Sequence, residues 1–232
     1  MNAKTETAHM QLIIDMSNEL TNLLNPLAGK PAKGVNLHLF TLCRYIESIA
    51  QGFLTLKQAG NHQAARVLIR TSIEAALKVA AVFNEPTILH RIAYTEYLGD
   101  KKLLKAADKG KIEVDLVAHA ARWSNDKRGI AKLFPGKVLK DTELQGPDLA
   151  KTAKLESLYD FQFRLYCNYT HATLRYLVKP QGINPAVDYI TIQSVLYAAL
   201  FVAVKNFGVS CPNLASYKDR VKAIGDQAAK AE

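Results

Sequence analysis

The chain has 232 residues and a formal net charge of +9, with 49% hydrophobic and 22% charged residues. This length suits one domain or at most two small ones, and the apolar content excludes a disordered chain because it supplies a packed core. The excess of positive charge favours polyanionic partners, although positive charge also keeps a protein soluble.

Two helices are predicted at the start of the chain. Apolar residues recur at helical spacing over residues 8–25, and the pattern stops at Asn25-Pro26. A longer helix is predicted over residues 35–59. Gly60 follows it, in the position where many helices end with a left-handed glycine.

The next two helices also carry boundary signals. Asn61 is placed to cap a helix that extends to about residue 83, because its side-chain oxygen can accept a hydrogen bond from a first-turn amide. Pro86 then stands in the first turn of a helix over residues 86–109, where its missing N–H costs nothing. We expect that helix to be interrupted near Gly99.

The helical pattern is weakest in the middle of the chain. A short helix is predicted over residues 112–123. Glycines, prolines and basic residues are then scattered through residues 124–148, which predicts an irregular and mobile basic loop region. Regular helix returns over about residues 152–178 and ends before Pro180.

The C-terminal part begins with a strong helix signal. Asn184 and Pro185 are placed to open a helix that Gly208 closes, and a weaker helix starts at about Leu214. The longest apolar run, residues 189–204, is shorter than the roughly 20 residues that span a bilayer. A buried core helix and no membrane contact are therefore predicted.

These elements predict an all-α fold. Signals for strands, such as alternating β-branched runs bounded by tight turns, are nearly absent. We expect residues 1–232 to form a single domain, a bundle of seven to nine helices, in which residues 185–232 supply the C-terminal helices.

The cysteine pattern and the missing motifs limit the kind of chemistry. Cys43, Cys167 and Cys211 lie far apart, which suits free thiols in a reducing compartment, and residues 1–20 lack a secretion signal. A cytoplasmic protein is therefore predicted. The chain has no phosphate-binding glycine loop and no zinc or di-iron ligand pattern, so we expect no cofactor and no metal.

One stripe of polar residues stands out in the predicted helix over residues 152–178. Arg164, Asn168 and His171 follow at i, i+4 and i+7, and Asp160 lies one turn earlier, so one helix face would carry all four. A histidine can transfer a proton in RNA cleavage, and an arginine can stabilise charge on a phosphate. The same spacing also suits a buried histidine and an arginine that bridges two helices.

A second polar pair lies in the helix after Asn61. Arg70 and Glu74 are four residues apart amid apolar residues, and Arg66 lies one turn earlier. Arg70 and Glu74 are expected to pair with each other or with charged residues of neighbouring helices. Such a pair inside a bundle fixes the register of the helices while adding little stability.

The segment Arg164-Leu-Tyr-Cys-Asn-Tyr-Thr-His171 resembles the Arg-x(4–6)-His signature of the HEPN superfamily of helical ribonucleases and nucleotide-binding domains. In that superfamily two subunits usually pair to form one RNA-cleaving groove. The resemblance implies a homodimer in which Arg164 and His171 are catalytic, with Asn168 as a lesser candidate.

A wider resemblance covers about residues 35–178. The run from Ala65 to Ala75 with its Arg-x3-Glu pattern, together with Tyr169-Thr-His171, resembles a bacterial all-helical family of unknown function. This resemblance implies that Arg70, Glu74 and His171 act together, and it implies no activity.

The positive charge is concentrated in one region. Residues 100–140 hold eleven Lys or Arg against five Asp or Glu, a local net charge of +6. Two further functions therefore stand beside the ribonuclease: a non-catalytic module that binds nucleic acid or an acidic protein through Lys127, Arg128 and Lys132, and a bundle with a purely structural polar network.

Overall fold

The computed structural model describes residues 2–29, 33–170 and 184–230. Within these residues it contains nine α-helices and no strand, which confirms the predicted all-α single domain. The helices are α1 (Ala3–Leu24), α2 (Val35–Gln58), α3 (His62–Asn84), α4 (Ile88–Lys109), α5 (Leu116–Leu133), α6 (Gly146–Ala153), α7 (Arg164–Thr170), α9 (Pro185–Phe207) and α10 (Leu214–Lys230). A 3₁₀ turn, η1 (Asn25–Leu27), follows α1, and a π-helical segment, η2 (Leu158–Phe163), precedes α7.

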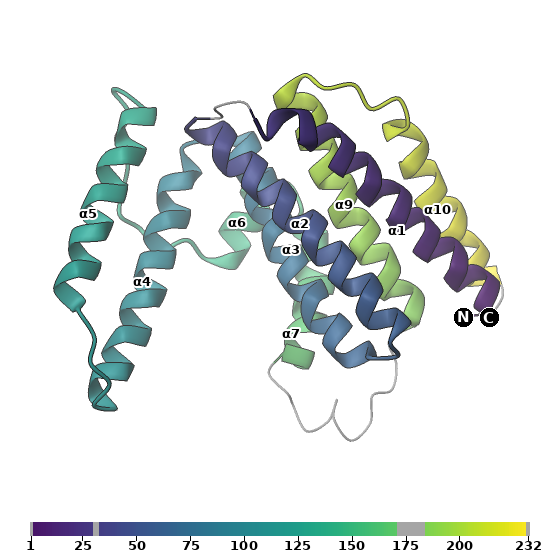
Figure 1. Ribbon diagram of the computed structural model, residues 1–232, viewed down its shortest axis with the longest axis horizontal. Helices are drawn as coiled ribbons and strands as arrows, with labels where there is room; N and C mark the ends of the chain where they lie inside the picture. Colours follow the sequence, from purple (N-terminus) through teal and green to yellow (C-terminus); the bar gives the residue numbers. More distant parts are fainter. Residues whose placement is uncertain (1, 30–32, 171–183, 231–232) are drawn as a thin grey trace.

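The core of the bundle forms around α9. Helices α1, α2, α3 and α10 all pack against it, as Figure 1 shows for α1, α2 and α10. Side chains such as Tyr189, Leu196 and Leu200 of α9 are fully buried. By length and composition α9 could cross a membrane, but 61% of its most apolar window is buried inside the protein. A helix that is apolar on all sides and enclosed by others is a core helix, as predicted.

Side-chain caps and left-handed glycines set several helix ends at the positions that the sequence predicts. The side chain of Asn61 accepts a hydrogen bond from the Ala64 amide, and Gly60 before it has a φ of +73°. At the start of α9, Asn184 accepts a hydrogen bond from the Ala186 amide, and α9 ends at Gly208 with a φ of +65°. These caps satisfy end groups that have no partner within the helix.

Helix α4 is more regular than expected, and α5 extends further than expected. The predicted interruption near Gly99 is wrong, since α4 is continuous, and the helix predicted to stop at residue 123 continues to Leu133. Gly129 is tolerated inside α5 at a modest cost, whereas Pro135 ends the helix because it drives the preceding Phe134 out of the helical region, to φ −130° and ψ 63°. Much of the predicted loop region 124–148 is therefore helical.

The single helix predicted over residues 152–178 is also wrong in its first half. Helix α6 ends at Ala153, and Lys154 adopts a left-handed conformation with a φ of +58°. The Leu155 amide donates back to the Ala150 carbonyl, which closes a C-terminal capping motif and lets Leu155 pack against the core. The π-helical η2 and then α7 follow, and residues 171–178 lie outside the described residues.

Helices α4 and α5 form an arm that stands to one side of the bundle (Figure 1). The segment after α5 returns along α4, where the Leu144 amide donates to the Thr95 hydroxyl at 2.7 Å and His90 Nε2 lies 2.8 Å from the Asp141 carboxylate. Rings from both helices form the seam between them, with Tyr97 stacked on His119 and on Trp123. The arm is thus held as one unit.

Two glycines give a matched test of these backbone assignments. Gly208→Ala should lower the free energy of unfolding by about 1 kcal/mol, because a side chain is strained in the left-handed region. Gly99→Ala should raise it by about 0.5–1 kcal/mol, because Gly99 is an open position inside a helix. Urea denaturation measures both. Equal effects in the two variants would contradict the assignments.

Candidate functional site

Arg164 begins α7 and lies at the surface. Its side chain is 65% exposed and lies 3.5 Å from the carboxylate of Asp160, which is 66% exposed. Its guanidinium also lies over the ring of Tyr159, 5.7 Å from the ring centre. An ion pair this exposed adds little stability. Arg164 is therefore available to a ligand and does not bridge two helices in a buried network.

Arg70 and Glu74 pair with each other across one turn of α3, at 3.0 Å. The Arg70 guanidinium lies over the ring of Phe163, and that ring is stacked on Tyr159 at 5.0 Å. Arg70 and Arg164 thus contact the two members of one aromatic pair.

The structure brings together four of the residues that the sequence singled out. Arg70, Glu74, Asp160 and Arg164 meet around the aromatic pair on α3, η2 and α7. Asn168 belongs to α7, but its side chain lies outside what the structure describes, as does the whole of His171. The geometry between Arg164 and His171 therefore stays a prediction.

The three predicted nucleic-acid contacts all belong to α5. Lys127 donates to Asp141 at 2.6 Å, and Arg128 donates to the side chain of Asn125 on the same helix. Partial burial alone would raise the pKa of Asp141, but hydrogen bonds from Lys127 and His90 lower it below its ordinary value. Lys132 is exposed. The three cations share the arm, but Lys127 is partly neutralised.

The most deeply buried charges form a cluster that the sequence analysis missed. The Asp188 carboxylate is fully buried and accepts from the ammonium of Lys57 at 2.8 Å. Nε of Arg66 donates to the same carboxylate at 3.2 Å, and the Tyr166 hydroxyl donates at 2.8 Å. Arg66 therefore belongs to this cluster and not to the Arg70–Glu74 pair. Side chains of α2, α3, α7 and α9 meet here, and we call them the Asp188 cluster.

The fold places these charges favourably at helix ends. Asp188 lies in the first turn of α9, where the helix dipole stabilises a negative charge. Lys57 lies in the last turn of α2, where a positive charge is favoured. The turn at Gly60 brings the first turn of α3 back against that end, so Arg66 reaches the same carboxylate.

Two phenols border the cluster as hydrogen-bond donors. Burial and the nearby Asp188 carboxylate raise the pKa of Tyr166 above its ordinary value. Burial likewise raises the pKa of Tyr189, whose hydroxyl donates to Glu6. Both phenols therefore keep their protons at neutral pH and support the carboxylates as donors.

One signal in the sequence could have revealed the cluster. Asp188 is the only acidic residue in the apolar helix Pro185–Phe207. A carboxylate in a buried helix needs a cationic partner, because an unpaired buried charge is very costly. Lys57 and Arg66 flank the α2–α3 turn and had no assigned partner, but periodicity within one helix does not show which distant helix lies opposite.

Among residues 2–29, 33–170 and 184–230, no group of three or more His, Cys, Asp or Glu side chains is arranged to hold a metal ion.

The model of DUF5677, described as a family of unknown function, matches residues 36–182. This range agrees closely with the predicted family-like core, residues 35–178. No curated protein matches the chain. No solved structure matches it.

The Asp188 cluster should dominate the effect of charge removal on stability. Asp188→Asn should lower the free energy of unfolding by about 3–5 kcal/mol, because two buried cations lose their carboxylate. Asp160→Asn makes the same change in an exposed pair and should shift it by less than about 1 kcal/mol. Thermal or urea denaturation compares the two. Similar losses in both variants would show that the Asp188 charges are not buried.

Proposed function

The chain belongs to DUF5677, and we propose that it binds RNA through the α4–α5 arm as a non-catalytic helical module. The observation that carries this proposal is the density of exposed cations on an arm that stands clear of the bundle. Within the described residues, seven exposed cations on the arm and the segment after it lie in no ion pair: Lys105, Lys109, Lys111, Arg128, Lys132, Lys137 and Lys140.

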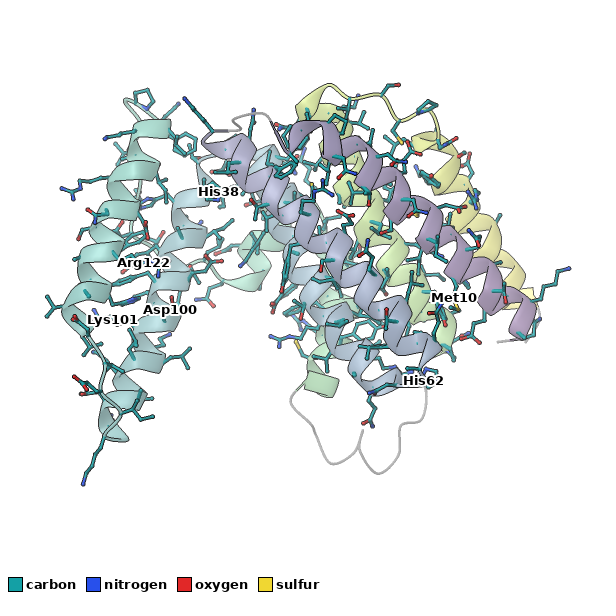
Figure 2. The ribbon with its side chains drawn as sticks, viewed as in Figure 1. Met10, His38, His62, Asp100, Lys101 and Arg122 are labelled. Atoms are coloured by element: carbon teal, nitrogen blue, oxygen red, sulfur yellow. The ribbon has the colours of Figure 1, made fainter. Side chains whose placement is uncertain are left out.

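The distribution of these cations suits an extended polyanion. Helix α5 has 18 residues and is therefore about 27 Å long, and cations continue beyond both of its ends. Figure 2 labels two further cations of the arm, Lys101 of α4 and Arg122 of α5. A phosphate backbone offers one charge every few ångströms, so many weak contacts add up as counterions are released.

The cysteines support a cytoplasmic setting for this binding. Cys43, Cys167 and Cys211 are free thiols in the structure. Burial raises the pKa of Cys43 to about 12, which makes that thiol unreactive. Free thiols of this kind persist in a reducing compartment, where RNA is also present.

Neutralising the arm should weaken RNA binding. A triple variant that combines Lys127→Gln, Arg128→Gln and Lys132→Gln should bind RNA with a weaker salt dependence. The slope of the logarithm of the binding constant against the logarithm of the salt concentration should become less steep by about 2–3. The slope is obtained from fluorescence anisotropy with labelled RNA at several salt concentrations. The matched control neutralises Lys4, Lys151 and Lys205, which are exposed elsewhere.

An unchanged slope in the arm variant would contradict the proposal. Loss of binding in both triple variants would show that net charge matters and the arm does not. An arm that binds polyglutamate but not RNA would assign it to an acidic protein partner instead.

The exposure of Arg164 favours a second candidate function. In this candidate the chain is an HEPN-like, metal-independent ribonuclease that acts as a homodimer, of the kind used in bacterial toxin or defence systems. His171 would assist attack of a ribose 2′-oxygen on the adjacent phosphate, and Arg164 would stabilise the charge that builds up there. The products would be a 2′,3′-cyclic phosphate and a 5′-hydroxyl. A side chain that is 65% exposed meets the first requirement, access to substrate.

The ribonuclease candidate predicts RNA cleavage that persists in EDTA. His171→Ala should abolish this cleavage, a loss of at least about 100-fold given the usual size of general acid–base catalysis. His38→Ala is the control, since it removes a histidine from the start of α2. Cleavage assays on purified protein, with circular dichroism to confirm folding, decide the matter. Equal activity in both variants excludes His171 as the catalytic base.

A further inference from the structure

The bundle contains a cavity that lies away from the arm. This cavity, of about 590 Å³, opens where the α2–α3 turn meets the start of α9. Six residues with polar side chains line it: Glu6, Lys57, Asn61, His62, Gln63 and Arg66. We propose that this cavity binds a small phosphorylated polyol, such as a sugar phosphate.

The size of the cavity matches a small molecule. Ligand sites for small molecules usually enclose roughly 300–1,000 Å³ and contain a few fixed polar groups. His62, labelled in Figure 2, is the first residue of α3 and lines this cavity.

Positive charge is fixed in the wall of the cavity. Lys57 and Arg66 both line it, while Asp188, which holds them, is fully buried beneath them and does not line it. The Lys57 ammonium lies 4.9 Å from the centre of the Tyr189 ring, which further restricts its position. Cations that are already ordered lose little entropy when they bind an anion, so they suit a specific ligand.

The start of α3 adds one hydrogen-bond donor for a phosphate, the Gln63 backbone amide. Asn61 caps the Ala64 amide, and the His62 amide donates to the Gly60 carbonyl. In the described part of the chain, the Gln63 amide of the same first turn donates no hydrogen bond. First-turn amides and the helix dipole together favour a bound phosphate.

The remaining polar groups suit hydroxyls. One carboxylate oxygen of Glu6 accepts a hydrogen bond from Tyr189, which leaves the other able to accept from a ligand hydroxyl. The side-chain amide of Gln63 is exposed at the rim and both donates and accepts. The site therefore offers phosphate donors at the Lys57 ammonium and the Gln63 backbone amide, and a hydroxyl acceptor at Glu6.

Calorimetric titration of the full chain tests this site with three probes: glucose 6-phosphate, glucose and inorganic phosphate. We expect glucose 6-phosphate to bind at least tenfold more tightly than either of the others, because it alone engages both the cations and Glu6. Equal affinity for glucose and glucose 6-phosphate overturns the anion assignment. Equal affinity for inorganic phosphate and glucose 6-phosphate overturns the polyol assignment.

A variant at the rim locates the binding without disturbing the buried charges. Gln63→Glu places a carboxylate in the first turn of α3, where the dipole favours it, so the fold is retained. It should weaken binding of glucose 6-phosphate at least tenfold by charge repulsion. Gln51→Glu, an exposed position of α2 outside the cavity, is the matched control and should bind as the unaltered protein does.

Equal affinity in Gln63→Glu and Gln51→Glu would show that the ligand does not occupy this cavity. Binding that is lost instead when Lys127, Arg128 and Lys132 are neutralised would place the anion on the arm, and the inference would then be wrong. RNA affinity of the Gln63→Glu variant separates this site from the proposed function, since it should stay unchanged.

Discussion

The bundle depends on one carboxylate that four helices share. Asp188 of α9 is bound by Lys57 of α2, Arg66 of α3 and Tyr166 of α7, and it is fully buried. Replacing such a cluster with apolar side chains is often neutral or stabilising in other proteins, because desolvation offsets much of the attraction. Its contribution here is therefore geometric. It sets which ends of α2, α3 and α9 face each other, and so it shapes the cavity beside them.

The segment before α7 brings side chains of two helices to one surface. Lys154 is left-handed and η2 is π-helical, so the chain from Thr152 to Thr170 is not one straight helix, but Asp160 still pairs with Arg164. Tyr159 and Phe163 of η2 are stacked on each other. Arg164 and Arg70 then lie over the two rings of that stack, although they come from different helices.

The sequence predicts those features that depend on neighbouring residues. The caps at Asn61 and Asn184 and the left-handed Gly60 and Gly208 were found because each acts within one turn of its helix. The length of α5 was misjudged because Gly129, together with the glycines and prolines that follow it, is typical of an irregular loop, although one glycine inside a helix costs only about 1 kcal/mol.

Features that depend on distant residues were not predicted. Asp188 meets Lys57 across 131 positions of the chain and Arg66 across 122, and no local pattern encodes such a pairing. The candidate site was therefore found in part. Arg70, Glu74, Asp160 and Arg164 do meet, but the buried cluster and its cavity required the packing of four helices to become visible.

The protein holds positive charge in two physically different ways, and this difference bears on what each region can recognise. Cations of the arm, such as Lys105 and Lys132, are exposed and lie in no ion pair in the described part of the chain. Long exposed side chains adapt to many phosphate positions, and their attraction is screened strongly by salt. Lys57 and Arg66 are instead held by Asp188 within a partly desolvated wall, where screening is weaker and geometry is strict. This difference is the reason for proposing a long and variable polyanion for the arm and one small ligand of defined shape for the cavity.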